Sequence, residues 1–372
     1  MPTAIPCLLM RGGTSKGPFF NAAHLPQDVA TRDRVLLAAM GSPDRRQIDG
    51  IGGGHPLTSK IGIVSKSAQA GVDLEFLFAQ VQPEQQTVDI RPNCGNMLAA
   101  AVPFALATGM LQADGESATF RVLARNTGML ADITLPLSAG QLADGGDACI
   151  DGVPGTAAAI EICFLETVGS ICKSLLPTGK PRERITVTGE GFAPFSIDIT
   201  CIDNGMPLVI FKATDLGASG YESVAELDAN TELRRRVEAL RLKAAQAMGL
   251  GDVSAKNYPK MTMVAQPLQG GAICTRSFIP HVCHDSIGVL AAVTVGTAIR
   301  LPGSICEGIA QRQAGAAVET IPIEHPSGVM TVTLSRSASH HDESPQLALL
   351  RTARVLMRGE LMVPSAVWAG QA

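Results

Sequence analysis

The sequence predicts an α+β fold of two pseudo-symmetric domains, each a β-sheet or barrel wrapped around a central buried helix. Most apolar segments are short, rich in β-branched residues and divided by Gly, Pro and Asp, which is typical of strands. Two longer segments, Asn96–Leu111 and Ser286–Ile299, contain no charged residue. A helix that is apolar on every face must be buried inside its domain. The length of 372 residues suits two domains.

The two halves also share a series of similar segments in the same order. Met97–Val102, in the first uncharged segment, aligns with Val289–Thr294 in the second. Ordered matches with drifting offsets are what two diverged copies of one domain give; chance similarity between Ala/Val-rich helices is the alternative. The further aligned pairs are Cys94 with Ser286, Lys60 with Lys260, Phe20 with Phe211, and Leu25 with Leu216.

Each element follows from its local pattern. Alternating or apolar β-branched runs predict strands at Ala4–Met10, Ile61–Val64, Val72–Gln80, Thr87–Ile90, Ala118–Leu123 and Met129–Thr134. Longer runs predict helices at Val29–Met40, Asn96–Leu111, Glu222–Met248 and Ser286–Ile299. Glu222–Met248 is amphipathic, so we expect it on the surface.

The domain boundary is expected in Leu176–Arg184, where Pro, Gly and charged residues come together. This gives an N-terminal domain of residues 1–184, containing Lys60 and Cys94, and a C-terminal domain of residues 185–372. Thr352–Pro364 alternates like a hairpin with Gly359 at its turn. The last ~20 residues are a candidate for packing back on the first domain.

Composition excludes several classes of function. A net charge of −4 and 4% aromatic residues argue against nucleic-acid binding. No apolar run approaches the ~20 residues of a membrane span, and the N-terminus lacks a signal-peptide pattern. Nine scattered cysteines do not form a disulfide framework, so we expect a cytoplasmic protein. A homodimer is among the oligomeric states that the sequence allows.

Cys94 is the first candidate for chemistry. It stands at the expected N-terminus of an uncharged helix, where the positive end of the helix dipole favours a thiolate. First-turn N–H groups can also hold a carboxylate. Cys94 therefore indicates acid–base chemistry on an anionic substrate, and Asn93, Gly95 and Asn96 beside it are expected to bind that substrate.

Two other segments have more than one interpretation. Arg11–Lys16 lacks the spacing of a phosphate-binding loop, so we expect a turn that binds a carboxylate through Arg11, Thr14 and Ser15. His281–Asp285 has closely spaced donors without distant partners, which makes a poor metal site, and no metal is expected. Asp285 or Ser286 is expected to cap the following helix, with Ser286 also orienting substrate. Arg276 either pairs with a substrate carboxylate or forms a structural ion pair.

Three motifs then resemble those of the PrpF family: Met10–Gly17, Leu57–Lys60 and Pro92–Met97. The resemblance runs from about Cys7 to about Pro364. It implies a fold like that of diaminopimelate epimerase, and an isomerase of 2-methylaconitate, methylitaconate or 4-oxalomesaconate. Further segments look most similar to the oxalomesaconate tautomerases of gallate and protocatechuate breakdown: Gln47–Gly53, Phe76–Val81 and Phe278–Gly288.

The resemblance implies a cofactor-independent 1,3-allylic proton shift on an unsaturated tricarboxylate. We expect 4-oxalomesaconate as the substrate, with 2-methylaconitate or methylitaconate as alternatives. It places the catalytic base at Lys60, its partner at Cys94, and substrate contacts at Ser59. A lysine that starts an apolar strand loses solvent, which favours its neutral, basic form. Whether Cys94 delivers the proton or only orients the substrate is open, and Lys60 alone could perform both transfers.

Two other classes of function stay open. An amino-acid epimerase of the same fold is disfavoured because Ser286, the counterpart of Cys94, is a poor proton acceptor without its own base. A non-enzymatic anion-binding protein would use the same helix N-terminus and turn without turnover.

Overall fold

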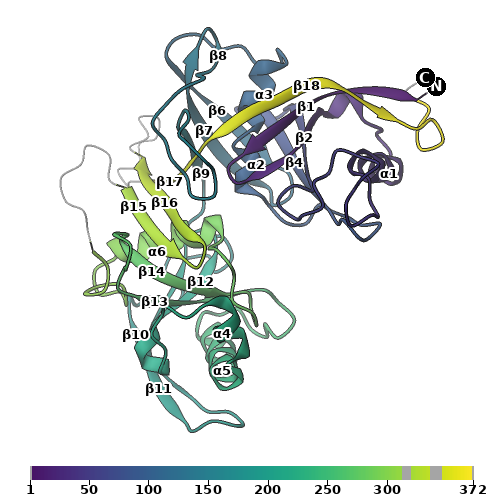
Figure 1. Ribbon diagram of the computed structural model, residues 1–372. Helices are drawn as coiled ribbons and strands as arrows, with labels where there is room; N and C mark the ends of the chain where they lie inside the picture. Colours follow the sequence, from purple (N-terminus) through teal and green to yellow (C-terminus); the bar gives the residue numbers. More distant parts are fainter. Residues whose placement is uncertain (1, 312–319, 336–345, 371–372) are drawn as a thin grey trace. The chain divides into compact units, whose positions relative to one another are not determined.

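The computed structural model describes residues 2–311, 320–335 and 346–370. The chain forms two compact units (Figure 1). The first unit contains Met1–Leu165 and Leu350–Ala372, and the second contains Glu166–Leu349. The division therefore falls before the expected boundary: Leu176–Arg184 lies within the second unit, whose first strand begins at Glu183. Among the described residues, no helix is both long and apolar enough to cross a membrane.

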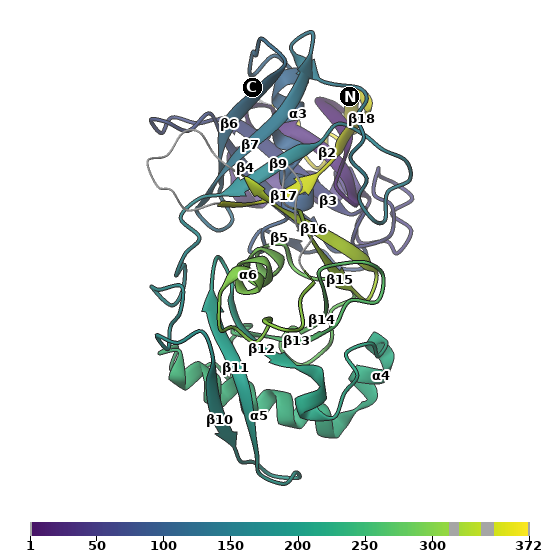
Figure 2. The ribbon, with the colours of Figure 1, turned by 90° about the vertical axis from the view of Figure 1, so that its left-hand side faces the viewer.

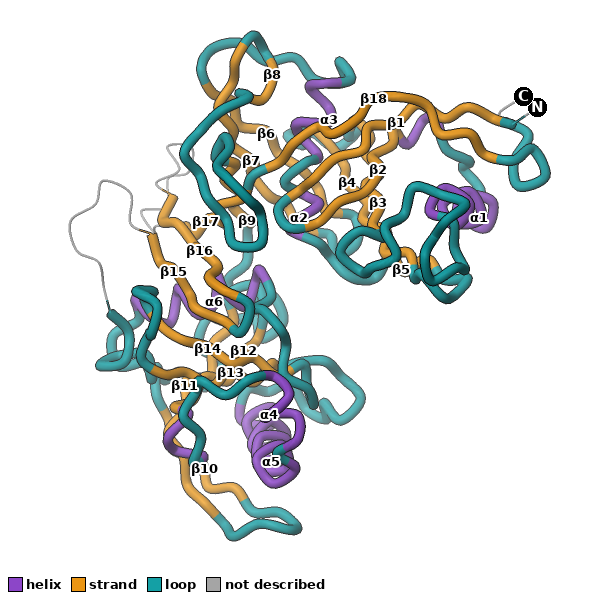
Figure 3. Tube along the Cα trace, in the orientation of Figure 1, coloured by secondary structure: helices purple, strands orange, loops and turns teal. Residues whose placement is uncertain are grey.

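Strands dominate the first unit (Figure 3). Its strands are β1 (Thr3–Gly12), β2 (Ser15–Asn21), β3 (Lys60–Lys66), β4 (Leu74–Val81), β5 (Val88–Asp89), β6 (Ser117–Ala124), β7 (Met129–Ser138), β8 (Gln141–Leu142), β9 (Ile160–Phe164) and β18 (Ala353–Val363). Its helices are η1 (Ala22–His24), α1 (Val29–Met40), α2 (Gly95–Leu98) and α3 (Ala101–Ala107). The strands pair in the order β18-β1-β2-β3-β4-β6-β7-β9. Only β2–β3 and β4–β6 in this series are parallel.

The second unit repeats this pattern. Its strands are β10 (Glu183–Val187), β11 (Phe195–Asp203), β12 (Pro207–Lys212), β13 (Lys260–Ala265), β14 (Ile273–Phe278), β15 (Thr320–His325), β16 (Gly328–Ser335) and β17 (Gln346–Arg351), whose last two residues belong to the first unit. Its helices are η2 (Ala213–Leu216), α4 (Val224–Ala229), α5 (Thr231–Ala247) and α6 (Val289–Arg300). The strands pair in sequence order, and the parallel pairs are again the third and the fifth, β12–β13 and β14–β15.

The equivalent strands place the aligned residues at equivalent positions. Lys60 is the first residue of β3, and Lys260 is the first residue of β13. Phe20 and Phe211 lie near the ends of β2 and β12, each followed by a short 3₁₀ helix. The expected α+β fold of two pseudo-symmetric domains is therefore confirmed.

Each unit wraps its sheet around a buried helix. In the second unit α6 lies among the strands β11, β12, β15 and β16, which it contacts (Figure 2). In the first unit the expected helix Asn96–Leu111 is buried, but it is divided into α2 and α3 by a turn at Ala99–Ala100. Pro103 explains the break, because it cannot donate a hydrogen bond to the carbonyl of Ala99 and its ring crowds that carbonyl.

Two other expected elements differ from the structure. Thr352–Pro364 is not a hairpin: β18 is one strand that pairs with β1 along its length, and Gly359 lies opposite Cys7 (Figure 1). Alternation of apolar and polar residues is equally the pattern of one half-exposed strand. The surface helix expected at Glu222–Met248 is interrupted at Asn230, whose side chain caps α5 by accepting a hydrogen bond from the backbone of Leu233.

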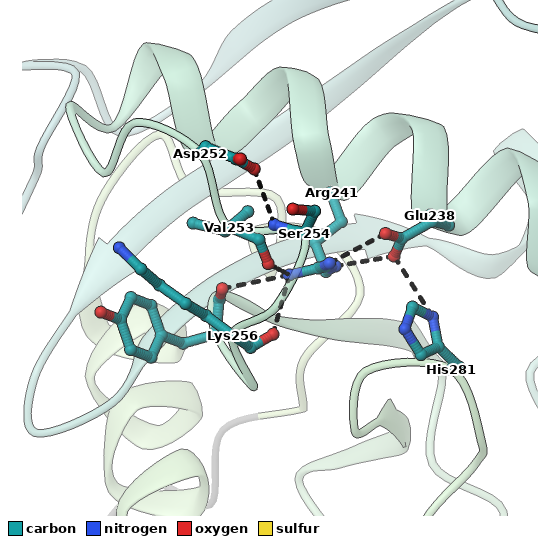
Figure 4. A network of polar contacts seen from close by, with 8 residues as sticks. Glu238, Arg241, Asp252, Val253, Ser254, Lys256 and His281 are labelled. Atoms are coloured by element: carbon teal, nitrogen blue, oxygen red, sulfur yellow. Dashed lines mark hydrogen bonds and ion pairs between the residues drawn. The ribbon is translucent and has the colours of Figure 1, made fainter.

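A buried arginine on α5 fixes the segment that leads into β13. Arg241 is fully buried and pairs with Glu238 at 2.7 Å (Figure 4). Its guanidinium also donates to the backbone carbonyls of Val253, Lys256 and Tyr258. Because a buried charge is costly unless it is paired and hydrogen-bonded, these contacts hold the loop immediately before Lys260 in one place.

Candidate active site

Glycines bring the three family motifs into one packed cluster in the first unit. A Cβ atom on Gly12 would lie 2.3 Å from the carbonyl oxygen of Asn96, and one on Gly13 would lie 2.2 Å from the Asn96 side-chain oxygen. A Cβ atom on Gly17 would lie 1.7 Å from the carbonyl oxygen of Lys60. Side chains cannot occupy such spaces, so the turn needs glycine where its backbone approaches the other motifs.

Lys60 is buried at the start of β3, with 9% of its surface exposed. Its Nζ donates to Oε1 of Gln80 at 2.6 Å and lies 4.9 Å from the centre of the Phe78 ring. Both partners come from β4, which pairs with β3 and places Gln80 opposite Lys60. Within the described chain, no carboxylate lies within 4.0 Å of Nζ. The amine is therefore oriented by an amide and a ring, with no carboxylate competing for it.

Gln80 and Gln47 hold the backbone around the lysine. The Nε2 atom of Gln80 donates to the carbonyl of Ser59 at 3.0 Å. The hydroxyl of Ser59, which is fully buried, donates to Oε1 of Gln47 at 2.8 Å. The same Gln47 oxygen accepts the backbone N–H of Gly54 at 2.9 Å. The Ser59 hydroxyl thus donates its hydrogen bond within the protein and helps to fix the backbone immediately before β3.

Cys94 is the N-cap residue of α2, as expected, and is half-buried. Its backbone N–H donates to Oδ1 of Asn93 at 2.8 Å, and the buried Gly95 begins the helix. The helix packs against β1, β2, β3 and β4, and β3 begins with Lys60. Because α2 has four residues, its dipole is small, and the expected contribution of a long helix at Cys94 is wrong.

Asn96 connects the turn to a residue from the C-terminal part of the chain. Its Nδ2 donates to the hydroxyl of Thr14 at 3.0 Å, and its Oδ1 accepts Nε–H of Arg351 at 2.9 Å. Both ends of the amide are therefore used inside the protein, and Asn96 acts by positioning these two neighbours.

Arg11 fastens the turn from its other side. Its Nη1 donates to the carbonyls of Gly13 and Thr352 at 2.9 and 3.0 Å, and to the Thr352 hydroxyl at 2.9 Å. Burial, and then the like charge of Arg354, lower the pKa of Arg11. Ser15 is different: its hydroxyl is buried and has no hydrogen-bond partner among the described residues. An unpaired buried hydroxyl is costly, and a bound carboxylate would satisfy it.

The second unit holds a different set of side chains near Lys260. The backbone N–H of Ser286 donates to Nδ1 of His284 at 2.8 Å, and the Ser286 hydroxyl lies 3.2 Å from Nε2 of His325. Burial lowers the pKa of Lys260. Burial also lowers the pKa of His284, with a further contribution from the positive charge of Lys260. Lys260, His284 and Ser286 thus form one cluster, and His325 gives Ser286 the imidazole neighbour that the sequence did not reveal.

The N-cap expected for α6 is wrong. Gly288 occupies that position and makes no side-chain cap, while Asp285 and Ser286 lie before it. A Cβ atom on Gly288 would lie 3.5 Å from Nζ of Lys260, so the absence of a side chain leaves space at the amine.

Arg276 is buried in β14 and is held by backbone carbonyls. Its Nε donates to the carbonyl of Glu222 at 2.7 Å, and its Nη1 donates to the carbonyl of Thr275 at 2.9 Å. No acidic side chain forms an ion pair with it in the described residues.

Sequence reasoning missed several of these contacts. Phe78 and Gln80 belong to Phe76–Val81, one of the segments that indicate the subgroup, and the alternation of a strand puts them on the same face. Arg351 and His325 had no such signal, because only the tertiary fold brings them to Asn96 and Ser286.

The sequence and the structure were compared with those of known proteins. The family described as PrpF protein matches residues 3–364. The chain is 47% identical to a 4-oxalomesaconate tautomerase of Pseudomonas putida, covering 99% of this chain and 98% of the relative. It is 48% identical to a (4E)-oxalomesaconate Delta-isomerase of a Novosphingobium species, with coverage of 96% and 97%. A crystal structure of a methylitaconate-delta-isomerase superimposes with a TM-score of 0.85 at 31% identity, covering 100% of this chain and 98% of that one.

The matches extend over the whole chain and include both units. The matched residues include the three motifs that contain Lys60, Asn96 and Cys94. The chain belongs to the PrpF family.

Proposed function

We propose that this protein is a cofactor-independent isomerase that moves a carbon–carbon double bond by a 1,3-proton shift in an unsaturated tricarboxylate, with 4-oxalomesaconate as its substrate. The observation that carries the proposal is the environment of Lys60. Its amine is buried, oriented by Gln80 and Phe78, and free of a carboxylate partner in the described chain. The strand that it begins, β3, packs against the helix that starts after Cys94. This is an arrangement suited to a general base.

In the proposed reaction the neutral amine of Lys60 removes an acidic proton from a carbon of the substrate. The resulting allyl anion is delocalised over the adjacent keto and carboxylate groups, so the reaction needs no redox step. A proton is then returned to the far carbon of the allyl system, and the double bond has moved by one position. Either the thiol of Cys94 or the ammonium of Lys60 returns the proton; in the first case solvent restores both groups to their starting forms.

The anionic groups of the substrate need donors that the protein has not already used. Ser15 offers a buried hydroxyl, and the turn around Thr14 offers backbone N–H groups. Arg11, Asn93, Gly95 and Asn96 shape this region through the contacts described above. In the second unit, Ser286 is the proposed substrate contact, with Arg276 as a further candidate.

The choice of 4-oxalomesaconate has two supports. Two relatives at 47% and 48% identity are named for oxalomesaconate. One segment that indicates this subgroup, Phe76–Val81, contacts the proposed base through Gln80 and Phe78. A second, Gln47–Gly53, holds the neighbouring Ser59 through Gln47. The runner-up is a methylitaconate or 2-methylaconitate isomerase, favoured by the overall likeness to the methylitaconate-delta-isomerase structure.

The test is a side-by-side assay of purified protein with 4-oxalomesaconate, 2-methylaconitate and methylitaconate. We expect kcat/KM to be highest for 4-oxalomesaconate by at least about tenfold, which corresponds to ~1.4 kcal/mol of transition-state discrimination. Faster turnover of either methylated acid would select the runner-up. Saturable binding of all three acids without turnover would instead indicate an anion-binding protein.

A further inference from the structure

Arg351 is a buried cation with no acidic partner among the described residues. Only 5% of the surface of Arg351 is exposed. Its Nε donates to Oδ1 of Asn96, and its Nη1 donates to the carbonyl of Leu350 at 2.8 Å. In the portion of the chain that the structure describes, no carboxylate lies within 4.0 Å of the guanidinium, and Nη2 has no hydrogen-bond partner. A buried charge is strongly unfavourable unless it is paired.

Cys94, at the proposed active site, interacts with the charge of Arg351. Burial lowers the pKa of Arg351 to about 10, and the neighbouring Cys94 opposes that shift. Asn96, two positions after Cys94, holds Nε and thereby fixes the plane of the guanidinium. The arginine is therefore oriented toward the start of α2 with donor capacity left over.

We propose that Arg351 binds a carboxylate of the substrate beside Cys94. The proposal rests on the proposed function and adds the residue that recognises one of the three carboxylates. An arginine presents N–H groups in a planar fork that matches a carboxylate, and such charge-assisted hydrogen bonds are the strong ones. The substrate would supply the counter-charge that no described residue provides at this position.

The alternative is that Arg351 only supports Asn96. That role needs the Nε contact and would be indifferent to the charge of a molecule arriving at Cys94. The two roles therefore differ in how Cys94 responds to anionic and neutral reagents of similar size.

Alkylation of Cys94 by iodoacetate and by iodoacetamide measures this difference. Iodoacetate carries the carboxylate that Arg351 would bind, and iodoacetamide is its neutral counterpart. Any effect of a variant on the reactivity of the sulfur changes both rates by the same factor and cancels in their ratio. Cys149, which is exposed, provides the reference ratio in the same sample.

In the wild-type protein we expect the iodoacetate-to-iodoacetamide rate ratio at Cys94 to exceed that at Cys149 by at least about tenfold, the size of one charge-assisted hydrogen bond. Arg351→Met should bring the ratio down to the Cys149 value, and Arg351→Lys should keep part of it. Arg354→Met, which removes an exposed arginine three positions later, is the matched control and should leave the ratio unchanged.

Equal ratios at Cys94 and Cys149 in the wild-type protein would overturn the proposal without the need for any variant. An unchanged ratio in Arg351→Met would overturn it as well. The measurement does not depend on turnover, so it stands apart from the assay of the proposed function. If the protein isomerises 4-oxalomesaconate but the iodoacetate-to-iodoacetamide ratio is equal at Cys94 and Cys149, the proposed role of Arg351 is wrong. The proposed isomerase function would then still stand.

Discussion

The two units give the same strand order two different chemical environments. Lys60 and Lys260 both begin the strand that pairs in parallel with the preceding one. Lys60 faces Gln80 across the antiparallel pair β3–β4. In the second unit β14 ends at Phe278, opposite Met261, so no residue of the described strand β14 pairs with Lys260 as Gln80 pairs with Lys60. Lys60 is held by an amide, whereas Lys260 is half-buried and acts on the imidazole of His284.

The central helices differ in the same way. The first unit presents the thiol of Cys94 at a short helix, with Arg351 as a nearby cation. The second unit has the continuous helix α6, preceded by Ser286 and its neighbour His325. The comparison teaches that a duplicated scaffold places a lysine and a helix start at equivalent positions. In the proposed mechanism, the neighbouring side chains decide which copy carries out proton transfer.

The largest expected effect concerns the charge of the first lysine. Lys60→Arg keeps a cation at the start of β3 but replaces the amine by a guanidinium, which does not deprotonate under working conditions. We expect kcat/KM for 4-oxalomesaconate to fall by about 10² to 10⁴, the usual contribution of a general base. Lys66→Arg, at the exposed end of the same strand, is the control and should be close to wild type. Near-normal activity of Lys60→Arg would show that this position supplies only positive charge.

The next effect concerns Cys94. Cys94 is half-buried immediately before α2, and Asn96, two positions later, holds the Arg351 guanidinium. We expect iodoacetamide near pH 7 to modify Cys94 more than about tenfold faster than the exposed Cys149, and substrate to protect it. Peptide mass spectrometry over a time course measures both rates. Earlier labelling of another cysteine would remove the thiol of the first unit from the proposed site.

A smaller effect is expected at Ser286. If its hydroxyl binds substrate, Ser286→Ala removes one hydrogen bond, worth about 0.5 to 1.5 kcal/mol, or roughly a 2- to 10-fold change. We expect the loss mainly as a higher KM, because the interaction is the same in the ground and transition states. A collapse of kcat at unchanged KM would mean that Ser286 and His325 take part in proton transfer.

The smallest effect is on stability. Burial lowers the pKa of Lys260 in the folded protein, so the unfolded chain binds the proton more tightly. The contribution of Lys260 to the free energy of unfolding therefore rises as the pH increases from the lowered value toward about 10.4. Lys260→Met should remove this slope and stabilise the protein near pH 7, as measured by urea unfolding at pH 7 and 9.5. The exposed Lys243→Met is the control; loss of stability in Lys260→Met at pH 7 would contradict the sign.

Sequence patterns predicted the scaffold well because it depends on local order. The bounds of Val29–Met40 agree with α1, and the alignment of Lys60 with Lys260 agrees with equivalent strand starts. Apolar periodicity and repeated order are properties of neighbouring residues, so they can be read without the structure.

The remaining features depend on contacts between distant residues. The hydrogen bond of Arg351 to Asn96 joins residues that are 255 positions apart. Likewise, the alternation in Thr352–Pro364 could not distinguish a hairpin from β18, because that choice depends on whether β1 is available as a partner. The break before α3 was readable in principle from Pro103, but the apolar run around it concealed the effect.

The most direct test of the difference between the units is one pair of variants, Lys60→Met and Lys260→Met. Methionine keeps an unbranched apolar side chain of similar length and removes the amine in each case. The account predicts that Lys60→Met lowers kcat/KM for 4-oxalomesaconate by about 10² to 10⁴. The decrease in kcat/KM caused by Lys260→Met should be smaller by a factor of at least about ten. Near-normal turnover in Lys60→Met together with a large loss in Lys260→Met would show that the base lies in the second unit, and would contradict the account.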